Sequence, residues 1–299
     1  MSGGTVRISS SVVGRTLPRS LFRATARSMM SYAAAVSADE DIYLDDLHPG
    51  GLHALPPFIV SPEWRVMNGQ PYRQALGLDD AAMWKCLHVQ QDSRFLRSLR
   101  PDQTLSTEGR IQSLRQTRAG VYVAVQLRTI SECDASLLAD SWFCGIFLDS
   151  VLDGPDRTLS AAPELTPWQA GEHALVRPLQ QIGRMLPHLY TAAADIWNPI
   201  HTERRAALDS GLSDILLHGT CTWAMAGRDL IRHYVPGNPA GLRRLAGRMA
   251  GKVAVGADLS LLHDVQPSDG DSSLCVRYQV VDAQGKVVLA DGLAEFDLL

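Results

Sequence analysis

The chain has 299 residues, of which 45% are hydrophobic, and it carries a formal net charge of −4. This is the composition of an ordinary globular protein, long enough for two domains of about 150 residues or for one larger domain. The slightly acidic balance gives no reason to expect nucleic acid as a partner, and no apolar run approaches the roughly 20 residues that cross a bilayer. The five cysteines and nine histidines are scattered, which fits a reducing compartment and predicts no metal site.

The first 38 residues contain no Asp or Glu but include five arginines, at positions 7, 15, 19, 23 and 27. Such a segment resembles an organellar transit peptide. The alternative, the basic start of a cytoplasmic protein, is favoured because residues 12–18 run without a break into a helical stretch. We therefore predict a cytoplasmic protein, with an organellar location as the minor alternative.

The first half of the chain contains one helix signal followed by strand signals. Residues 19–36 read as a helix, and Asp39, Asp41, Asp45 and Asp46 form an acidic loop after it. An alternation of valine and leucine with polar residues at 121–128 is typical of a half-buried strand. The remaining predicted elements are a short extended run at 56–60, a helical turn within 78–87, a strand at 137–149 and a proline-containing linker at 152–167.

The second half predicts helices first and strands afterwards. Residues 219–234 read as a long helix whose first two turns have no polar face, so other elements must surround it. It follows a helix at 183–194 and a short helix that starts at 206. Strands are predicted at 252–262, 274–281 and 286–298, with a hairpin connection at 281–286.

A buried helix followed by consecutive antiparallel strands is an α+β pattern in which one sheet curls round one helix. The segment 190–195, Tyr-Thr-Ala-Ala-Ala-Asp, echoes Tyr-Ala-Ala-Ala-Val at 32–36, so the plan occurs twice. We expect an N-terminal domain at 1–151, a linker at 152–167 and a C-terminal domain at 168–299 that carries the active site.

Residues 190–230 resemble the signature of the MaoC-like, (R)-specific enoyl-CoA hydratase family. That family has the motif Asp-x-Asn-Pro-x-His and a later His-Gly pair that opens its central helix. Asn198, Pro199 and His201 match the motif, and His218 and Gly219 match the pair. The resemblance implies a hot-dog fold, and the repeat implies a double hot dog whose first half is a degenerate copy.

The resemblance also implies the chemistry, which is the addition or removal of water at the 2,3 double bond of an acyl thioester. Asp195 would be the general base, and His201 would orient the same water or supply a proton. The Gly219 N–H, helped by the helix dipole, would stabilise the developing enolate oxygen, although a glycine could also stand there for steric reasons. Asn198 either binds water or holds the turn, and Thr220 is a pocket or cap residue. No metal or other cofactor is implied.

The chain departs from the family motif at the aspartate. The family has one residue between Asp and Asn, but Ile196 and Trp197 both separate Asp195 from Asn198. Catalysis is sensitive to shifts of about an ångström. Two alternatives to a hydro-lyase therefore stay open: a hot-dog protein that binds acyl thioesters or a partner without hydrating them, and a hot-dog thioesterase.

The expected partner is an acyl-CoA or an acyl-carrier-protein substrate, and neither nucleic acid nor a membrane is expected. A homodimer is a further possibility. The acidic run of the first half reads as a solvated loop. The functional alternative is a vestigial half that widens the acyl pocket.

Overall fold

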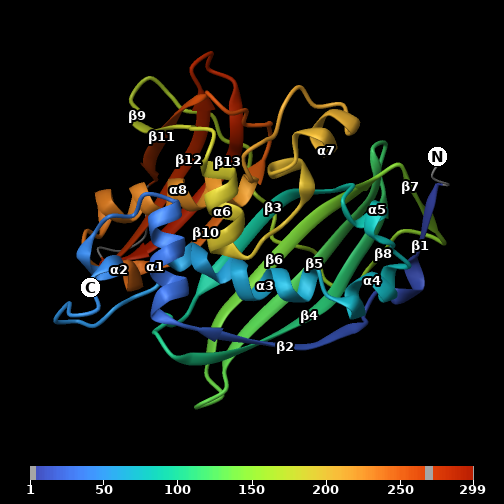
Figure 1. Ribbon diagram of the computed structural model, residues 1–299, viewed down its shortest axis with the longest axis horizontal. Coiled ribbons are helices and arrows are strands. Elements are labelled where there is room, and N and C mark those ends of the chain that lie inside the picture. The colour runs from blue at the N-terminus through green and yellow to red at the C-terminus, as the bar shows by residue number, and fades with distance from the viewer. Residues whose placement is uncertain (1–4, 267–271, 299) are drawn as a thin grey trace.

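An eleven-stranded antiparallel sheet carries the helices on one of its faces (Figure 1). The computed structural model describes residues 5–266 and 272–298. In the order in which they pair, the strands are β2 (Thr16–Ala24), β4 (Gln103–Gln116), β5 (Gly120–Ser131), β6 (Leu137–Leu148), β3 (Cys86–Phe95), β10 (Leu242–Met249), β13 (Val287–Asp297), β12 (Ser273–Asp282), β11 (Asp258–Gln266) and β9 (Leu175–Gln181), with β8 (Arg157–Thr158) on β4. A separate parallel pair joins β1 (Val6–Ser9) to β7 (Ser150–Asp153).

The helices fall into two similar series along the chain. The first comprises α1 (Ala26–Ala35), α2 (Asp41–Leu44), α3 (Val60–Met67), α4 (Gln70–Leu76) and α5 (Asp80–Met83), and the second comprises α6 (Leu186–Ala194), α7 (Arg204–Asp209) and α8 (Gly219–Tyr234). Single 3₁₀ turns occur at η1 (Ser10–Val12), η2 (Pro56–Ile59), η3 (Pro199–His201) and η4 (Pro239–Gly241). In the sheet, the strands of the first half of the chain end at β3, and those of the second half begin at its neighbour β10. The α+β double hot dog is therefore confirmed. No helix among the described residues is long and apolar enough to cross a membrane.

The sequence echo between residues 32–36 and 190–195 corresponds to two helices that pack on each other. Tyr32 of α1 and Tyr190 of α6 are both fully buried, and their hydroxyl oxygens lie 3.3 Å apart. The residue five positions after each tyrosine, Ser37 and Asp195, has a positive φ of 56°. Asp195 therefore has Ser37, not an aspartate of the acidic loop, as its counterpart in the first half.

Helix α8 lies at the centre of the larger core, as its sequence predicted. Its residues are buried without interruption from Thr220 to Ile231, and the Trp223 side chain is completely enclosed. Charged residues appear only towards its C-terminal end, where α8 meets the first half of the chain. The prediction that 219–234 forms a helix surrounded by other elements is confirmed.

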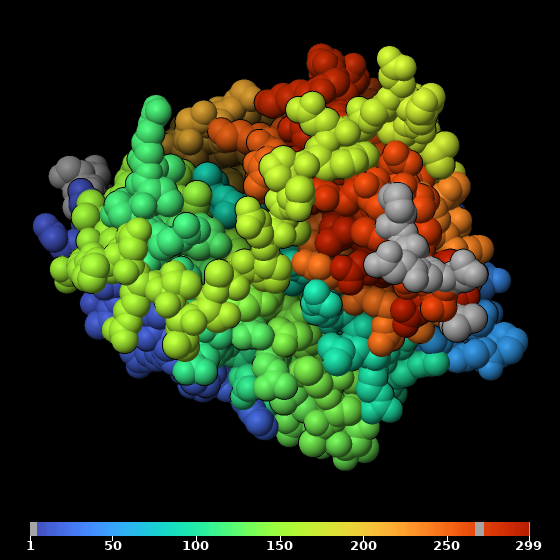
Figure 2. Space-filling view, turned by 180° about the vertical axis from the view of Figure 1, so that it is seen from behind, coloured from blue at the N-terminus to red at the C-terminus, as the bar shows by residue number. Residues whose placement is uncertain are grey.

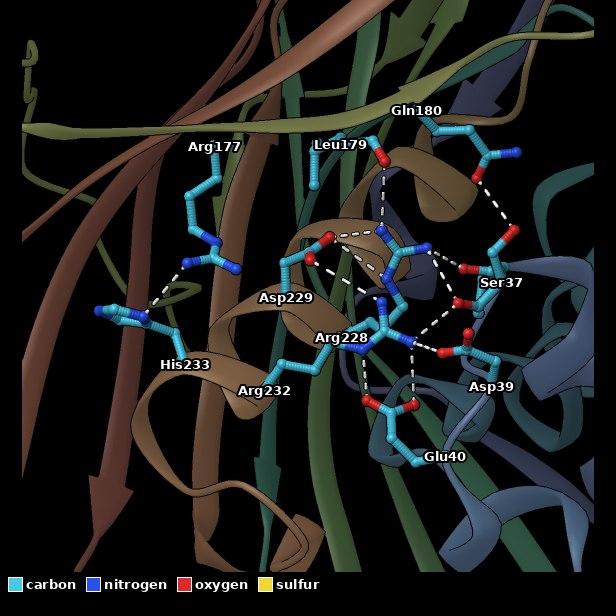
Figure 3. Close-up of polar contacts among 11 residues, drawn as sticks. Ser37, Asp39, Glu40, Arg177, Leu179, Gln180, Arg228, Asp229, Arg232 and His233 are labelled. Atoms are coloured by element: carbon cyan, nitrogen blue, oxygen red, sulfur yellow. Dashed lines mark hydrogen bonds and ion pairs between the residues drawn. The ribbon is translucent and has the colours of Figure 1, made fainter.

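Two arginines of α8 bind the segment that follows α1 (Figure 3). Arg228 is buried, forms an ion pair with Asp229 and donates to the carbonyl of Val36. Arg232 binds the carboxylates of Asp39 and Glu40. The start of the acidic run is thus not only a solvated loop, because it fastens the first half of the chain to the central helix of the second.

The two halves of the sheet meet at β3 and β10. Asp92 of β3 and Arg244 of β10 are buried and form two hydrogen bonds, of 2.9 and 2.7 Å. On the opposite face of the sheet from the helices, the segment after β8 crosses from the first half to the second (Figure 2). Its Pro163 carbonyl accepts from Gln90 of β3, and the Trp168 N–H donates to Asp291 of β13.

Several predicted boundaries were wrong. Residues 19–24 belong to strand β2, which pairs with β4, and the helix begins only after Thr25, whose side chain forms a capping box with Ser28. Residues 56–60 are not extended, because η2 leads directly into α3. The strand expected at 252–262 begins later, at Asp258, and β4 and β10 were not predicted at all. The strands at 121–128, 137–149, 274–281 and 286–298 and the hairpin between the last two are confirmed.

Candidate active site

The motif turn begins where α6 ends, and a left-handed residue sets its direction. Asp195 follows α6 with φ 56° and ψ 33°, a conformation that aspartate tolerates better than most side chains. Asn198 then starts η3: its side-chain oxygen accepts from the Ile200 N–H at 3.3 Å. This hydrogen bond corresponds to the second of the two roles considered for Asn198, which is to hold the turn. The residue also lines the cavity described below.

His201 ends this turn in a defined protonation state. Its Nδ1–H donates to the carbonyl of Leu216 at 2.8 Å, which leaves Nε2 as the basic nitrogen. Burial lowers the pKa of His201 to about 4, although the bond to Leu216 opposes the shift. The imidazole is therefore neutral near pH 7 and able to accept a proton.

His218 supports His201 from behind. The two rings stack with centroids 3.7 Å apart and an angle of 24° between their planes. The Nε2–H of His218 donates to the Ile196 carbonyl at 3.2 Å, so His218 also holds the motif turn. Burial, followed by the neighbouring His201, lowers the pKa of His218 well below its ordinary value. A structural role for His218 agrees with these contacts.

Gly219 and Thr220 form the N-terminal end of α8. The first N–H groups of a helix have no partner inside it, and the helix dipole makes this end favourable for negative charge. A Cβ atom on Gly219 would lie only 2.6 Å from Cγ of Met249, so the steric reason for a glycine is present as well. Both residues line the same cavity as His201.

That cavity has a volume of about 320 Å³, within the range of small-molecule sites. It lies where the two halves meet, between α3 and β3 on one side and the motif turn and the start of α8 on the other. Its apolar lining comes largely from the first half of the chain: Val60, Trp64, Met67, Met83, Leu127 and Phe143. The predicted residues Asn198, His201, Gly219 and Thr220 thus surround one space, whose apolar part suits an acyl chain.

Asp195 does not reach this cavity, so the expected convergence of Asp195 with His201 is not observed. Its side chain is 64% exposed, and its Oδ2 lies 3.2 Å from a guanidinium nitrogen of Arg65 on α3. Ile196 lines the cavity instead. The physical reason is the additional residue before Asn198. Asp195 occupies the left-handed position that ends α6, and Ile196 is therefore the residue whose side chain points into the cavity.

Glu63, His88 and Gln91 also line the cavity, and the sequence analysis missed all three. A signal for Glu63 existed, because Val60, Glu63, Trp64 and Met67 have the i, i+3, i+4, i+7 spacing of one helix face, with a single acid among apolar residues. The interpretation of 56–60 as extended concealed that helix. Within the described residues, no group of three or more His, Cys, Asp or Glu side chains is placed to hold a metal ion.

Comparisons with known proteins bear on the family and the fold of the chain. Residues 171–280 match the family model described as "MaoC like domain". A curated relative, "Probable enoyl-CoA hydratase 2" of Dictyostelium discoideum, is 22% identical over 170 residues, which make up 57% of this chain. The match spans only about 57% of that relative's own length.

Solved structures share the fold over nearly the whole chain. A MaoC-like dehydratase from Phytophthora capsici superposes with a TM-score of 0.76 at 17% identity, covering 93% of this chain and 95% of its own. The full-length peroxisomal multifunctional enzyme type 2 of Drosophila melanogaster gives 0.74 at 20% identity, covering 94% of this chain and 48% of its own. Residues 171–280 thus match the MaoC-like family model, as the motif predicted, and nearly the whole chain shares the double hot-dog fold of the solved structures.

Proposed function

We propose that the chain is a hydro-lyase that adds water to, or removes it from, the 2,3 double bond of an acyl thioester. The observation that carries the proposal is the neutral His201, with Nδ1 occupied by Leu216 and Nε2 basic, in one cavity with the N-terminal end of α8. The apolar lining supports an acyl chain as ligand. The matching family and the curated hydratase relative support the reaction class.

In the hydration direction, Nε2 of His201 takes a proton from water as the water oxygen attacks C3. The electrons of the double bond move towards the thioester, whose oxygen becomes an enolate oxygen. The Gly219 N–H donates to that oxygen, and the helix dipole adds to the stabilisation. The imidazolium then gives a proton to C2, which yields a 3-hydroxyacyl thioester, of (R) configuration if the site follows the family. Dehydration is the reverse of these steps.

This mechanism assigns no step to Asp195, since its carboxylate is exposed and paired with Arg65. One group, His201, acts as base and then as acid. A positioned acid or base contributes typically 10²–10⁴-fold, so a site with one such group should turn over more slowly than a site with two.

A second candidate function is the binding of acyl thioesters without hydration. Ile196 favours it, because an apolar side chain lines the cavity at the motif position where the family has its aspartate. Thioester hydrolysis, the third candidate, would require attack of water on the carbonyl carbon and would release a free thiol.

The carrier of the acyl group is either coenzyme A or a carrier protein. A surface hollow of about 420 Å³ opens beside the motif turn and is lined by Arg184, His188, Thr202 and Arg204, among others. Arg204 lies 3.6 Å from the carboxylate of Asp214, which lines the same hollow, and Arg184 adds a second cation. A cation here suits a phosphate, which both carriers possess. A homodimer stays a prediction.

The test uses the full chain with crotonyl-CoA and longer 2-enoyl-CoAs. Loss of enoyl absorbance with formation of a 3-hydroxyacyl-CoA supports the hydro-lyase. Binding by calorimetry with no change in the thioester supports the second candidate. Release of free CoA supports the third, and the absence of both binding and turnover contradicts all of them.

A further inference from the structure

A buried carboxyl group lies in the part of the cavity formed by the first half of the chain. Glu63 is 3% exposed and lines the cavity from α3, between the apolar side chains of Val60 and Met67. Its Oε2 accepts a hydrogen bond from Nε2 of Gln91 at 3.1 Å. Its Oε1 is buried and has no hydrogen-bond partner among the described residues.

The proton on this group has a defined place. Burial raises the pKa of Glu63 to about 8, and Asp140 adds to the rise while Ser141 and Gln91 oppose it. The carboxyl group is therefore mostly protonated at neutral pH. Because the Gln91 amide donates to Oε2, the proton belongs on Oε1.

The neighbouring polar groups also form hydrogen bonds with one another. Nε2 of Gln91 also donates to Ser93 at 2.9 Å, and the Ser141 hydroxyl donates to Ser93 at 2.9 Å. His88 of β3, which also lines the cavity, has its Nε2 3.0 Å from the carbonyl of Gln90. A buried donor without an acceptor costs free energy, which a ligand oxygen would recover.

We propose that Glu63 is a specificity residue that donates a hydrogen bond from Oε1 to an oxygen atom on the acyl chain of the ligand. The preferred ligands are then acyl thioesters whose chain carries a hydroxyl, keto or ether oxygen, and not plain alkyl thioesters. This inference rests on the proposed function for the identity of the ligand as an acyl thioester, and on the cavity alone for the polar site.

Binding of saturated acyl-CoAs tests the inference independently of turnover, because these compounds have no double bond to hydrate. The probes are acyl-CoAs of one chain length in which a single hydroxyl group is moved from carbon 4 outwards, beside the unsubstituted compound. Carbon 3 is left out, because a 3-hydroxyacyl-CoA would itself be a substrate for dehydration. Calorimetry on the wild type should find one position at which the hydroxyl compound binds about tenfold more tightly. If the unsubstituted compound binds at least as tightly as every hydroxyl compound, the inference is overturned.

Three variants identify the group responsible. Glu63→Leu should abolish the preference, whereas Glu63→Gln should retain it, since its amide can accept from Gln91 and still donate to the ligand. Met67→Leu, one turn further along α3, should change the affinity for both compounds alike. A preference that survives in Glu63→Leu would overturn the inference.

The pH profile separates hydrogen-bond donation from a purely structural role. For this profile the probe carries a keto oxygen at the preferred position, because a keto oxygen accepts but cannot donate to an ionised carboxylate. The wild-type preference for it should fall as the pH rises through about 8, where Glu63 loses its proton, while that of Glu63→Gln should stay level. A level wild-type profile would contradict donation by Glu63. Among the other groups that line the cavity, burial lowers the pKa values of His88 and His201 to about 4 and raises the pKa of Cys86 to about 12, so none of these three changes charge near pH 8.

Failure of this inference is distinguishable from failure of the proposed function. Selective binding of the hydroxylated probes without hydration of any enoyl-CoA would support the polar site and contradict the hydro-lyase. Hydration of plain enoyl-CoAs without any preference for the hydroxylated probes would contradict the polar site and support the hydro-lyase. If Glu63→Gln alone abolishes the hydration of plain enoyl-CoAs, Glu63 belongs to the chemistry, and the specificity role is wrong.

Discussion

The N–H of Gly219 is the group to which we assign stabilisation of the enolate, and a pair of variants can isolate it. The single substitution Gly219→Pro would mix two effects. Any Cβ at this position lies 2.6 Å from Cγ and 3.5 Å from Cβ of Met249, so packing would be disturbed as well. Met249→Ala removes the obstructing side chain and provides a background in which the chemistry can be read.

In that background, Gly219→Ala retains the N–H and Gly219→Pro removes it. Gly219 is the first residue of α8, a position where proline is well accepted. His218 before it has φ −64° and ψ 137°, the extended conformation that a residue before proline favours. The fold should therefore tolerate both substitutions once Met249 is shortened.

Loss of a single oxyanion donor costs about 2.7–4 kcal/mol in the barrier. The proline double variant should therefore have a kcat about 10²–10³-fold below that of the alanine double variant, with a similar KM. The assay is enoyl-CoA hydration, with thermal unfolding of both variants measured alongside. Equal kcat values in two folded variants with matching melting temperatures would refute the assignment.

Three further predictions concern protonation and the contacts that join the halves. Burial lowers the pKa values of His88 and His201 to about 4, so between pH 4 and about 6.5 the unfolded chain binds protons that the folded chain does not. The free energy of unfolding should therefore fall as the pH drops through this window, and denaturant titrations should find a smaller fall in His201→Gln. Arg228→Met leaves the buried Asp229 with only the 4.0 Å contact to Arg232 and should lower the free energy of unfolding by about 3–5 kcal/mol, whereas Arg23→Met, which breaks an exposed pair with Asp102, should change it far less; equal losses would contradict this account of the contact between α8 and the end of α1. Asp92→Asn should weaken the junction of β3 with β10 and lower the melting temperature, and a melting temperature unchanged by this substitution would show that the buried pair does not hold the two halves together.

The sequence predicted those parts of the fold in which a pattern repeats over many residues. Helix α8 was located to the residue because no polar face interrupts its first two turns, and β5 because valine and leucine alternate with polar side chains. Strand β2 was mistaken for a helix, since Leu17, Phe22 and Ala24 on its inner face are too few for the pattern to be decisive. There the pairing with β4, a contact distant in sequence, determines the structure.

The candidate site divides in the same way. Asn198, His201, Gly219 and Thr220 were found because they form a contiguous motif and a helix start. The direction of Asp195 was not predictable from spacing, since it depends on whether the extra residue is absorbed before or after the left-handed turn. Glu63 belongs to the other half of the chain, and only tertiary packing brings it into the cavity.

Hydration of a 2-enoyl-CoA by His201→Gln and by Asp195→Asn, measured side by side with the wild type, tests the central claim most directly. His201→Gln should lower kcat about 10²–10⁴-fold, since the only assigned acid and base is lost. Asp195→Asn should stay close to the wild type, because its carboxylate is exposed and paired with Arg65. A wild-type rate in His201→Gln together with a large loss in Asp195→Asn would contradict the assignment of the chemistry to His201.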